Sequence, residues 1–107
     1  MEYYTKYVIR ATPELTDKMI ESLISLTRYE FDSYGEEMWA DIKWWNYDSE
    51  MRKFSLMFPD TVFTVQGQGE EQSDRWMEYW KNGKSQNAYL RIEYDEFDET
   101  KLIDGIK

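Results

Sequence analysis

The sequence contains no cysteine and no histidine. Without cysteine, the chain has no disulfide, no thiol nucleophile and no cysteine-ligated metal site. The absence of histidine removes the commonest general base, the commonest zinc ligand and every serine–histidine triad. Long apolar runs are also missing, since no stretch approaches the roughly 18 apolar residues that indicate a membrane span. These absences argue against an enzyme and predict no metal, no cofactor and no membrane contact.

Positive charge is scarce as well. The chain has 13 basic and 22 acidic residues, a net charge of −9 and a pI of about 4.5. Direct binding to nucleic acid is therefore disfavoured, because that affinity comes mainly from Lys and Arg at the phosphates. An excess of acidic residues favours a basic protein partner, or serves solubility alone.

What is present is a compact chain rich in aromatic residues. Its 107 residues are 41% hydrophobic and 18% aromatic, which fits one domain with a substantial core. We expect an α+β domain over residues 1–94, followed by an acidic C-terminal tail over 95–107. The N-terminal letters MEYYTKYVIRA carry charges within their apolar run and lack a small-residue cleavage site. This pattern predicts no signal peptide and a cytoplasmic location.

Residue patterns predict the first elements in turn. Residues 3–11 alternate as a strand. Thr12 as N-cap and Pro13 at the first helical position predict a helix that ends near residues 28–30, with Gly35 as the breaker. The letters MWADIKWW predict a second strand with two distinct faces. One face has Met38, Ala40, Ile42 and Trp44, and the other has Trp39, Asp41, Lys43 and Trp45.

A second helix and three strands complete the predicted domain. Asp48 or Ser49 is expected to cap this helix, and Pro59 to end it. Residues 61–66 form the third strand, and Asn82-Gly83 is typical of the turn of a hairpin between residues 75–81 and 85–94. Four side chains of the last strand are expected to face the core, namely Ala88, Leu90, Ile92 and Tyr94. The tail is expected to dock through Phe97 or Leu102.

The predicted order is therefore β-α-β-α-β-β-β. Two helices should cover one face of a mainly antiparallel sheet, as in a ferredoxin-like α+β sandwich. The opposite face is expected to show four aromatic side chains, namely Tyr4, Trp39, Trp45 and Tyr89.

Three stretches within residues 36–94 carry a family resemblance. These are DIKWW at the end of a strand, then FPDTVFTV, and then GEE followed by W, Y and NGK. Together they resemble small phage and mobile-element proteins with a YubB-like ferredoxin-like domain, although Ala40 stands where that family usually has glycine. The resemblance implies the fold and a mobile-element origin, and it brings no catalytic residues.

The stretch Gly67-Gln68-Gly69 follows a predicted strand, as phosphate-binding loops do. A dinucleotide loop needs a third glycine where Gln72 stands, and Glu70 and Glu71 would repel phosphate. We therefore interpret the two glycines as positions where the strand bulges or bends.

Carboxylates gather in two places. Glu70, Glu71 and Asp74 follow the glycines, and the tail contains Asp95, Glu96, Asp98 and Glu99. Two such groups are able to act as acid and base or as ligands of Ca²⁺ or Mg²⁺. Solvated surface charge explains them better, and a carboxylate-dependent hydrolase remains the remote alternative.

The function predicted from these features is non-enzymatic binding. An acidic face is able to occupy a basic nucleic-acid channel, as small anti-restriction and anti-CRISPR proteins of mobile elements do. The expected partner is thus a host defence or nucleic-acid-handling protein, bound by a monomer or homodimer. The alternative is an RNA or small-ligand binder whose aromatic sheet face stacks bases. Candidate partner-binding residues are Trp39, Trp45, Glu70, Glu71, Asp74, Asp95, Glu96 and Asp98.

Overall fold

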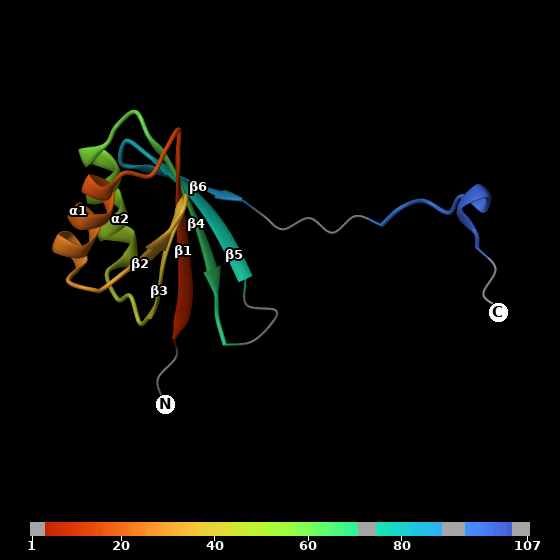
Figure 1. The fold of residues 1–107 in the computed structure, drawn as a ribbon, viewed down its shortest axis with the longest axis horizontal. Coiled ribbons are helices and arrows are strands. Elements are labelled where there is room, and N and C mark those ends of the chain that lie inside the picture. The colour runs from red at the N-terminus through yellow and green to blue at the C-terminus, as the bar shows by residue number, and fades with distance from the viewer. Residues whose placement is uncertain (1–3, 71–74, 89–93, 104–107) are drawn as a thin grey trace.

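An antiparallel sheet with two helices on one face forms the body of the protein (Figure 1). The computed structural model describes residues 4–70, 75–88 and 94–103. Within these residues the sheet has six strands in the order β2-β3-β1-β4-β5-β6. The elements are β1 (Thr5–Thr12), α1 (Asp17–Thr27), β2 (Asp32–Tyr34), β3 (Glu37–Ile42), α2 (Tyr47–Met57), β4 (Val62–Gln68), β5 (Arg75–Lys81), β6 (Lys84–Ala88) and the short 3₁₀ helix η1 (Glu99–Lys101).

The α+β class and the two helices are confirmed, but the predicted order of elements was wrong. The observed order of the sheet domain is β-α-β-β-α-β-β-β, because the letters DSY form the additional strand β2. Gly35 does not end a helix. It lies between β2 and β3 with a φ of 63°, a conformation that glycine adopts without strain. Helix α1 ends earlier, at Thr27, where Arg28 takes a left-handed conformation and its N–H donates to the carbonyl of Ile24.

Both helix starts also differ from the prediction. The N-cap of α1 is Thr16 rather than Thr12, and its hydroxyl accepts a hydrogen bond from the Met19 amide at 3.2 Å. Helix α2 begins after Asn46, ahead of the expected caps Asp48 and Ser49. It ends at Met57, just before Pro59, as predicted. No described helix is long and apolar enough to cross a membrane.

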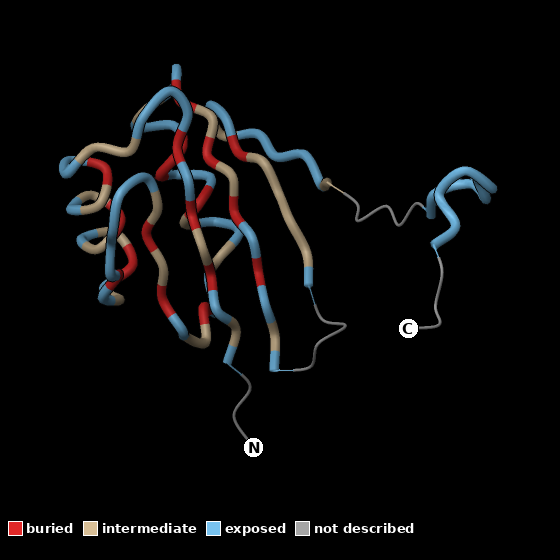
Figure 2. The backbone as a smooth tube through the Cα atoms, turned by 45° about the vertical axis from the view of Figure 1, so that its right-hand side comes forward, coloured by how far each residue is buried: buried red, intermediate tan, exposed pale blue. Residues whose placement is uncertain are grey.

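The core lies between the sheet and the helices. Buried and exposed positions alternate along the central strands (Figure 2), so Tyr7, Ile9 and Ala11 of β1 face the helices. The predicted alternation of β3 is confirmed, since Met38 and Ala40 are buried. Aromatic rings fill one end of this core at centroid separations of 5.1–6.0 Å, and they belong to Tyr7, Trp44, Tyr47, Trp76 and Trp80.

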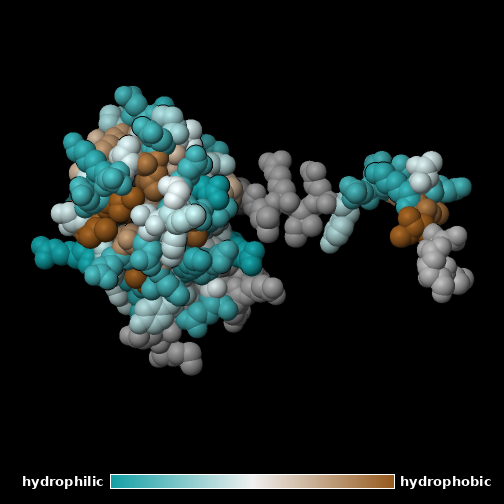
Figure 3. All heavy atoms as spheres, in the orientation of Figure 1, coloured by the Kyte–Doolittle hydropathy of each residue, from teal (hydrophilic) through white to brown (hydrophobic). Residues whose placement is uncertain are grey.

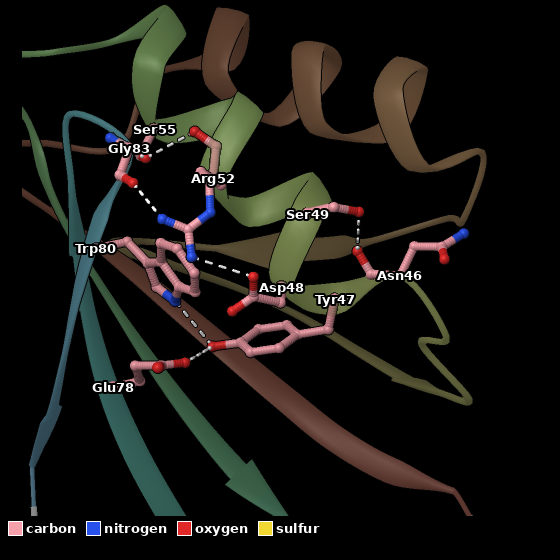
Figure 4. Close-up of polar contacts among 9 residues, drawn as sticks. All are labelled: Asn46, Tyr47, Asp48, Ser49, Arg52, Ser55, Glu78, Trp80 and Gly83. Carbon is pink, nitrogen blue, oxygen red and sulfur yellow. Dashed lines mark hydrogen bonds and ion pairs between the residues drawn. The ribbon is translucent and has the colours of Figure 1, made fainter.

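The hairpin between β5 and β6 has the predicted Asn-Gly turn. Asn82 and Gly83 both have positive φ, at 49° and 76°. The turn is also fixed to α2, because the Gly83 amide donates to Ser55 Oγ at 2.8 Å and Arg52 Nη1 donates to the Gly83 carbonyl at 2.6 Å (Figure 4). The last strands are therefore joined to the helical layer.

Gly67 allows a close approach between side chain and backbone. It lies inside β4, where it pairs with Trp76 of β5 in a regular register, so the expected bulge or bend is not found at this residue. A Cβ atom at Gly67 would overlap the indole ring of Trp76. The glycine thus makes room for an aromatic ring, and the strand continues past it to Gln68 instead of opening into a phosphate loop.

Gly67→Ala is therefore expected to displace the Trp76 indole and to destabilise the protein by about 1–3 kcal/mol, as overpacked cores do. Urea denaturation monitored by tryptophan fluorescence measures this loss. A matched Gly67→Ala/Trp76→Leu double variant should lose less than the sum of the two single changes. Additive losses would contradict the steric explanation.

Candidate binding surface

The sheet face that points away from the helices, here called the open face, has an apolar row at its centre. Trp39, Val8, Gln66, Met77 and Ala88 stand side by side on β3, β1, β4, β5 and β6. Gln66 interrupts the apolar row, and its amide nitrogen lies 3.8 Å from the sulfur of Met77. Trp39 is half-buried, as a ring lying against neighbouring side chains would be. The aromatic open-face residue predicted in β3 is confirmed at this position.

Basic side chains outnumber acidic ones on the open face, although the chain as a whole is acidic. Among the strand residues that the structure describes, alternation with the buried positions places five basic and three acidic side chains on this face, whereas the whole chain has 13 basic and 22 acidic residues. The acidic groups all lie on β2 and β3, and three of the basic groups lie on β5 and β6. The basic residues are Lys6, Arg10, Arg75, Lys81 and Lys84, and the acidic residues are Asp32, Glu37 and Asp41.

One ion pair crosses this face. Arg10 of β1 binds Glu37 of β3, with 2.8 Å between Nη2 and Oε2. Strands β4, β5 and β6 have no acidic side chain at their described open-face positions. This half of the face is therefore suited to a negatively charged ligand.

A hollow of about 680 Å³ lies on the basic half of the open face. Val62 and Tyr79 provide apolar surface within it, while Lys81 and Lys84 provide positive charge. The remaining lining residues are Pro59, Asp60, Asn82, Ser85 and Gln86. Asp60 is the one carboxylate in the lining, and the two lysines outnumber it.

A second hollow, of about 620 Å³, lies at the edge of the sheet where β1 begins and β3 and β4 end. It contains Lys6, Asp41 and Glu70, and the carboxylate of Glu70 accepts a hydrogen bond from the Tyr4 amide at 2.9 Å. Glu70 thus has a structural contact at the predicted turn. Glu71 and Asp74, the other two carboxylates predicted there, lie outside the described residues, as do Tyr89, Leu90 and Ile92.

Trp45 is separate from Trp39. It lies in the loop after β3, is 78% exposed, and has the ammonium group of Lys43 at 4.9 Å from its ring centroid. A cation at this distance from an exposed ring contributes about 0.5–1 kcal/mol. The two tryptophans do not form the shared stacking platform considered from the sequence, because β3 ends at Ile42.

The C-terminal segment Tyr94–Ile103 stands clear of the body (Figure 1). Tyr94 was expected to face the core but is 89% exposed, so that prediction was wrong. The expected docking of the tail is not seen either, because Phe97 and Leu102 are 77% and 64% exposed and Ile103 is 90% exposed. Apolar side chains are visible on this segment in Figure 3. The segment thus exposes large apolar groups that no described contact covers.

The acidic tail residues surround this apolar surface. Asp95, Glu96 and Glu99 are exposed, and Asp98 caps η1 by accepting hydrogen bonds from the amide and hydroxyl of Thr100 at 3.0 and 2.7 Å. These bonds hold the pKa of Asp98 below its usual range, so this carboxylate stays ionised. The described tail carboxylates and Glu70 belong to separate parts of the structure (Figure 1), so they do not form one acidic face.

A part-buried polar network joins α2 to the helix-facing side of the sheet and was not predicted from the sequence. The Tyr47 hydroxyl donates to Glu78 Oε1 at 2.7 Å and accepts from the Trp80 indole N–H at 2.9 Å (Figure 4). Burial, helped by the nearby Glu78, raises the pKa of Tyr47 well above its usual value. The phenol is therefore neutral and holds α2 against β5, which is a structural role.

Among the described residues, no three carboxylates gather closely enough to hold a metal ion. No family model, curated protein or solved structure gives a significant match to this chain. The open face and the C-terminal segment are therefore the surfaces from which a function has to be inferred.

Proposed function

We propose that this chain is a non-enzymatic binding protein that occludes part of another protein, with the open face as its main contact. The observation that supports this most directly is the apolar row containing Trp39, Val8 and Met77. Charged residues flank this row, and an apolar centre within a polar rim is how protein interfaces are built. A half-buried tryptophan within such a row is a typical binding anchor.

The basic half of the open face and the acidic tail require oppositely charged surfaces on the partner. The basic half of the open face suits an acidic segment of the partner, whereas the tail carboxylates Asp95, Glu96 and Asp98 suit a basic groove. A partner whose basic groove normally holds nucleic acid fits the second contact. The resemblance to phage and mobile-element proteins supports a host defence protein as this partner, bound in the cytoplasm.

We also propose that the fold is a ferredoxin-like domain extended by a hairpin. Elements β1 to β4 follow the order β-α-β-β-α-β, which is the ferredoxin-like order. Strands β5 and β6 then extend the sheet beside β4. The extension adds to the open face the strands on which its basic half is built.

Capture from a host lysate, comparing Trp39→Ala with Trp45→Ala, tests the binding role. We expect Trp39→Ala to weaken capture of a specific protein about thirtyfold or more, since an interface anchor contributes about 2 kcal/mol or more. Trp45→Ala is the matched control, because it removes an exposed ring outside the open face. Equal capture by both variants, with melting temperatures showing both folded, would exclude the open face.

RNA binding is the second candidate, favoured by the position of Tyr79 beside Lys81 and Lys84. A ring beside two cations is able to stack a base while the lysines contact phosphates. If RNA binds, Tyr79→Ala should weaken binding of a labelled single strand by about 1–3 kcal/mol. Fluorescence anisotropy at physiological salt decides between the candidates, because no detectable binding at micromolar protein would exclude this one.

A further inference from the structure

Two surfaces of this chain have complementary chemistry. The hollow on the open face contains Lys81 and Lys84 beside Tyr79. The C-terminal segment presents Phe97 with a carboxylate on each side, at Glu96 and Asp98. One surface supplies positive charge around an apolar floor, and the other supplies negative charge around an exposed ring.

The charges of the two surfaces are opposite in sign. Asp95, Glu96, Asp98 and Glu99 place four carboxylates within five residues of the segment, which also contains Lys101. In the hollow, Lys81 and Lys84 outnumber Asp60, the one carboxylate among its described lining residues. Attraction between the surfaces therefore exceeds repulsion, and mixed pairs of this kind fix the orientation of a contact.

Apolar area gives the contact its free energy. The described side chains of the segment include Tyr94, Phe97, Leu102 and Ile103, all more than 60% exposed. Burial of such groups contributes about 25 cal/mol per Å² removed from water. The hollow, at about 680 Å³, has room for a large side chain such as that of Phe97 beside Val62 and Tyr79.

We propose that the segment Tyr94–Ile103 of one copy docks in this hollow of a second copy, and that the exchange is reciprocal. The inference rests on the proposed role of the open face as a binding surface. The segment stands clear of its own body in the structure, so it is available to another copy (Figure 1). Each copy has both surfaces, so the segment of each copy fills the hollow of the other. Two equivalent contacts then form a closed two-fold dimer.

Sedimentation of the full chain at micromolar concentrations tests the exchange. We expect a dimer, and Phe97→Ala should raise its dissociation constant by about tenfold or more, as loss of an interface anchor does. Trp45→Ala is the control and should leave the dimer unchanged. A wild-type chain that stays monomeric overturns the proposal, whether its segment is free or folded back on its own body.

Charge reversal makes the test specific. One variant reverses the hollow with Lys81→Glu and Lys84→Glu, and another reverses the segment with Asp95→Lys and Glu96→Lys. Each alone should be monomeric, because the reversed residues of one surface then face like charges on the other in both contacts. An equal mixture should form a heterodimer, in which both contacts again join opposite charges. A dimer that persists in each variant alone, or a mixture that stays monomeric, overturns the proposal.

The outcome is separable from that of the proposed function. Trp39 lies outside the hollow, so capture of a partner through Trp39 can fail while the dimer persists. Loss of the dimer with capture retained would refute only the exchange. Binding of labelled single-stranded RNA in the hollow, abolished by the Lys81→Glu and Lys84→Glu variant of a monomeric chain, would replace the exchange with the nucleic-acid candidate.

Discussion

Trp80→Ala is expected to lower the free energy of unfolding by about 3–5 kcal/mol, the loss typical of a deleted large core side chain. Trp80 is fully buried, and its loss would leave a cavity between β5 and α2. It would also remove the N–H donor to Tyr47 and the ring that lies 5.3 Å from the Arg52 guanidinium carbon. Guanidinium chloride denaturation gives the value.

Trp45→Ala is the matched control, since it deletes the same side chain from a site that is 78% exposed. Its effect should stay at or below about 1 kcal/mol, which is the loss of the contact between this ring and Lys43. Similar losses in the two variants would show that Trp80 does not hold the β5–β6 hairpin against the helices.

Tyr47→Phe is expected to cost about 2–3 kcal/mol although it removes a single oxygen atom. The Trp80 N–H would then be buried without an acceptor, and Glu78 would lose the donor that stabilises its carboxylate. Unsatisfied groups of this kind cost about 1–3 kcal/mol each, and more when they are charged. The melting temperature and the free energy of unfolding should fall together.

Tyr34→Phe is the control for this change, because Tyr34 is 83% exposed and its hydroxyl is accessible to water. A further Glu78→Leu substitution in the Tyr47→Phe protein should recover part of the stability, since it removes the carboxylate left without its partner. A Tyr47→Phe protein as stable as the wild type would show that the network contributes nothing net.

Local patterns allowed much of the fold to be predicted from the sequence. The alternation of Met38, Trp39 and Ala40 gave the faces of β3, and Asn82-Gly83 gave the hairpin turn. Strand β2 was missed because its three residues are all exposed and have no apolar periodicity. Strand β2 pairs with β3 through the tight turn at Gly35. A glycine in the sequence is equally compatible with such a turn and with the end of a helix.

The start of α1 shows how local signals compete. Thr12 with Pro13 and Thr16 with Asp17 are both acceptable helix starts by sequence. Thr12 instead pairs with Val62 as the last residue of β1, so it is part of the sheet and cannot cap the helix. Thr16 is therefore the N-cap of α1. Tertiary pairing decided between two equal local preferences.

The candidate surface was only partly predictable for a related reason. Trp39 followed from strand alternation, whereas the basic half of the open face depends on β5 and β6 lying beside β4. The Tyr47 network joins residues 31 and 33 positions apart, which no short motif records. Tyr94 was expected to face the core and Phe97 to dock on the body, because both are apolar. Both are exposed, because the segment extends away from the core.

The hydrogen bonds between Gly83 and α2 determine from which end strand β6 frays. Both backbone groups of this residue are bonded to Ser55 and Arg52, so the turn end of the β5–β6 hairpin is held by the helix. Within the described sheet, β6 pairs with β5 alone, and its Ala88 end leads toward the C-terminal segment. Local opening therefore begins at Ala88 and advances toward the turn, and amide hydrogens should exchange fastest at Ala88 and slowest near Gly83. Strand β6 is thus fixed to the helix at its turn end, and we expect its Ala88 end to open first.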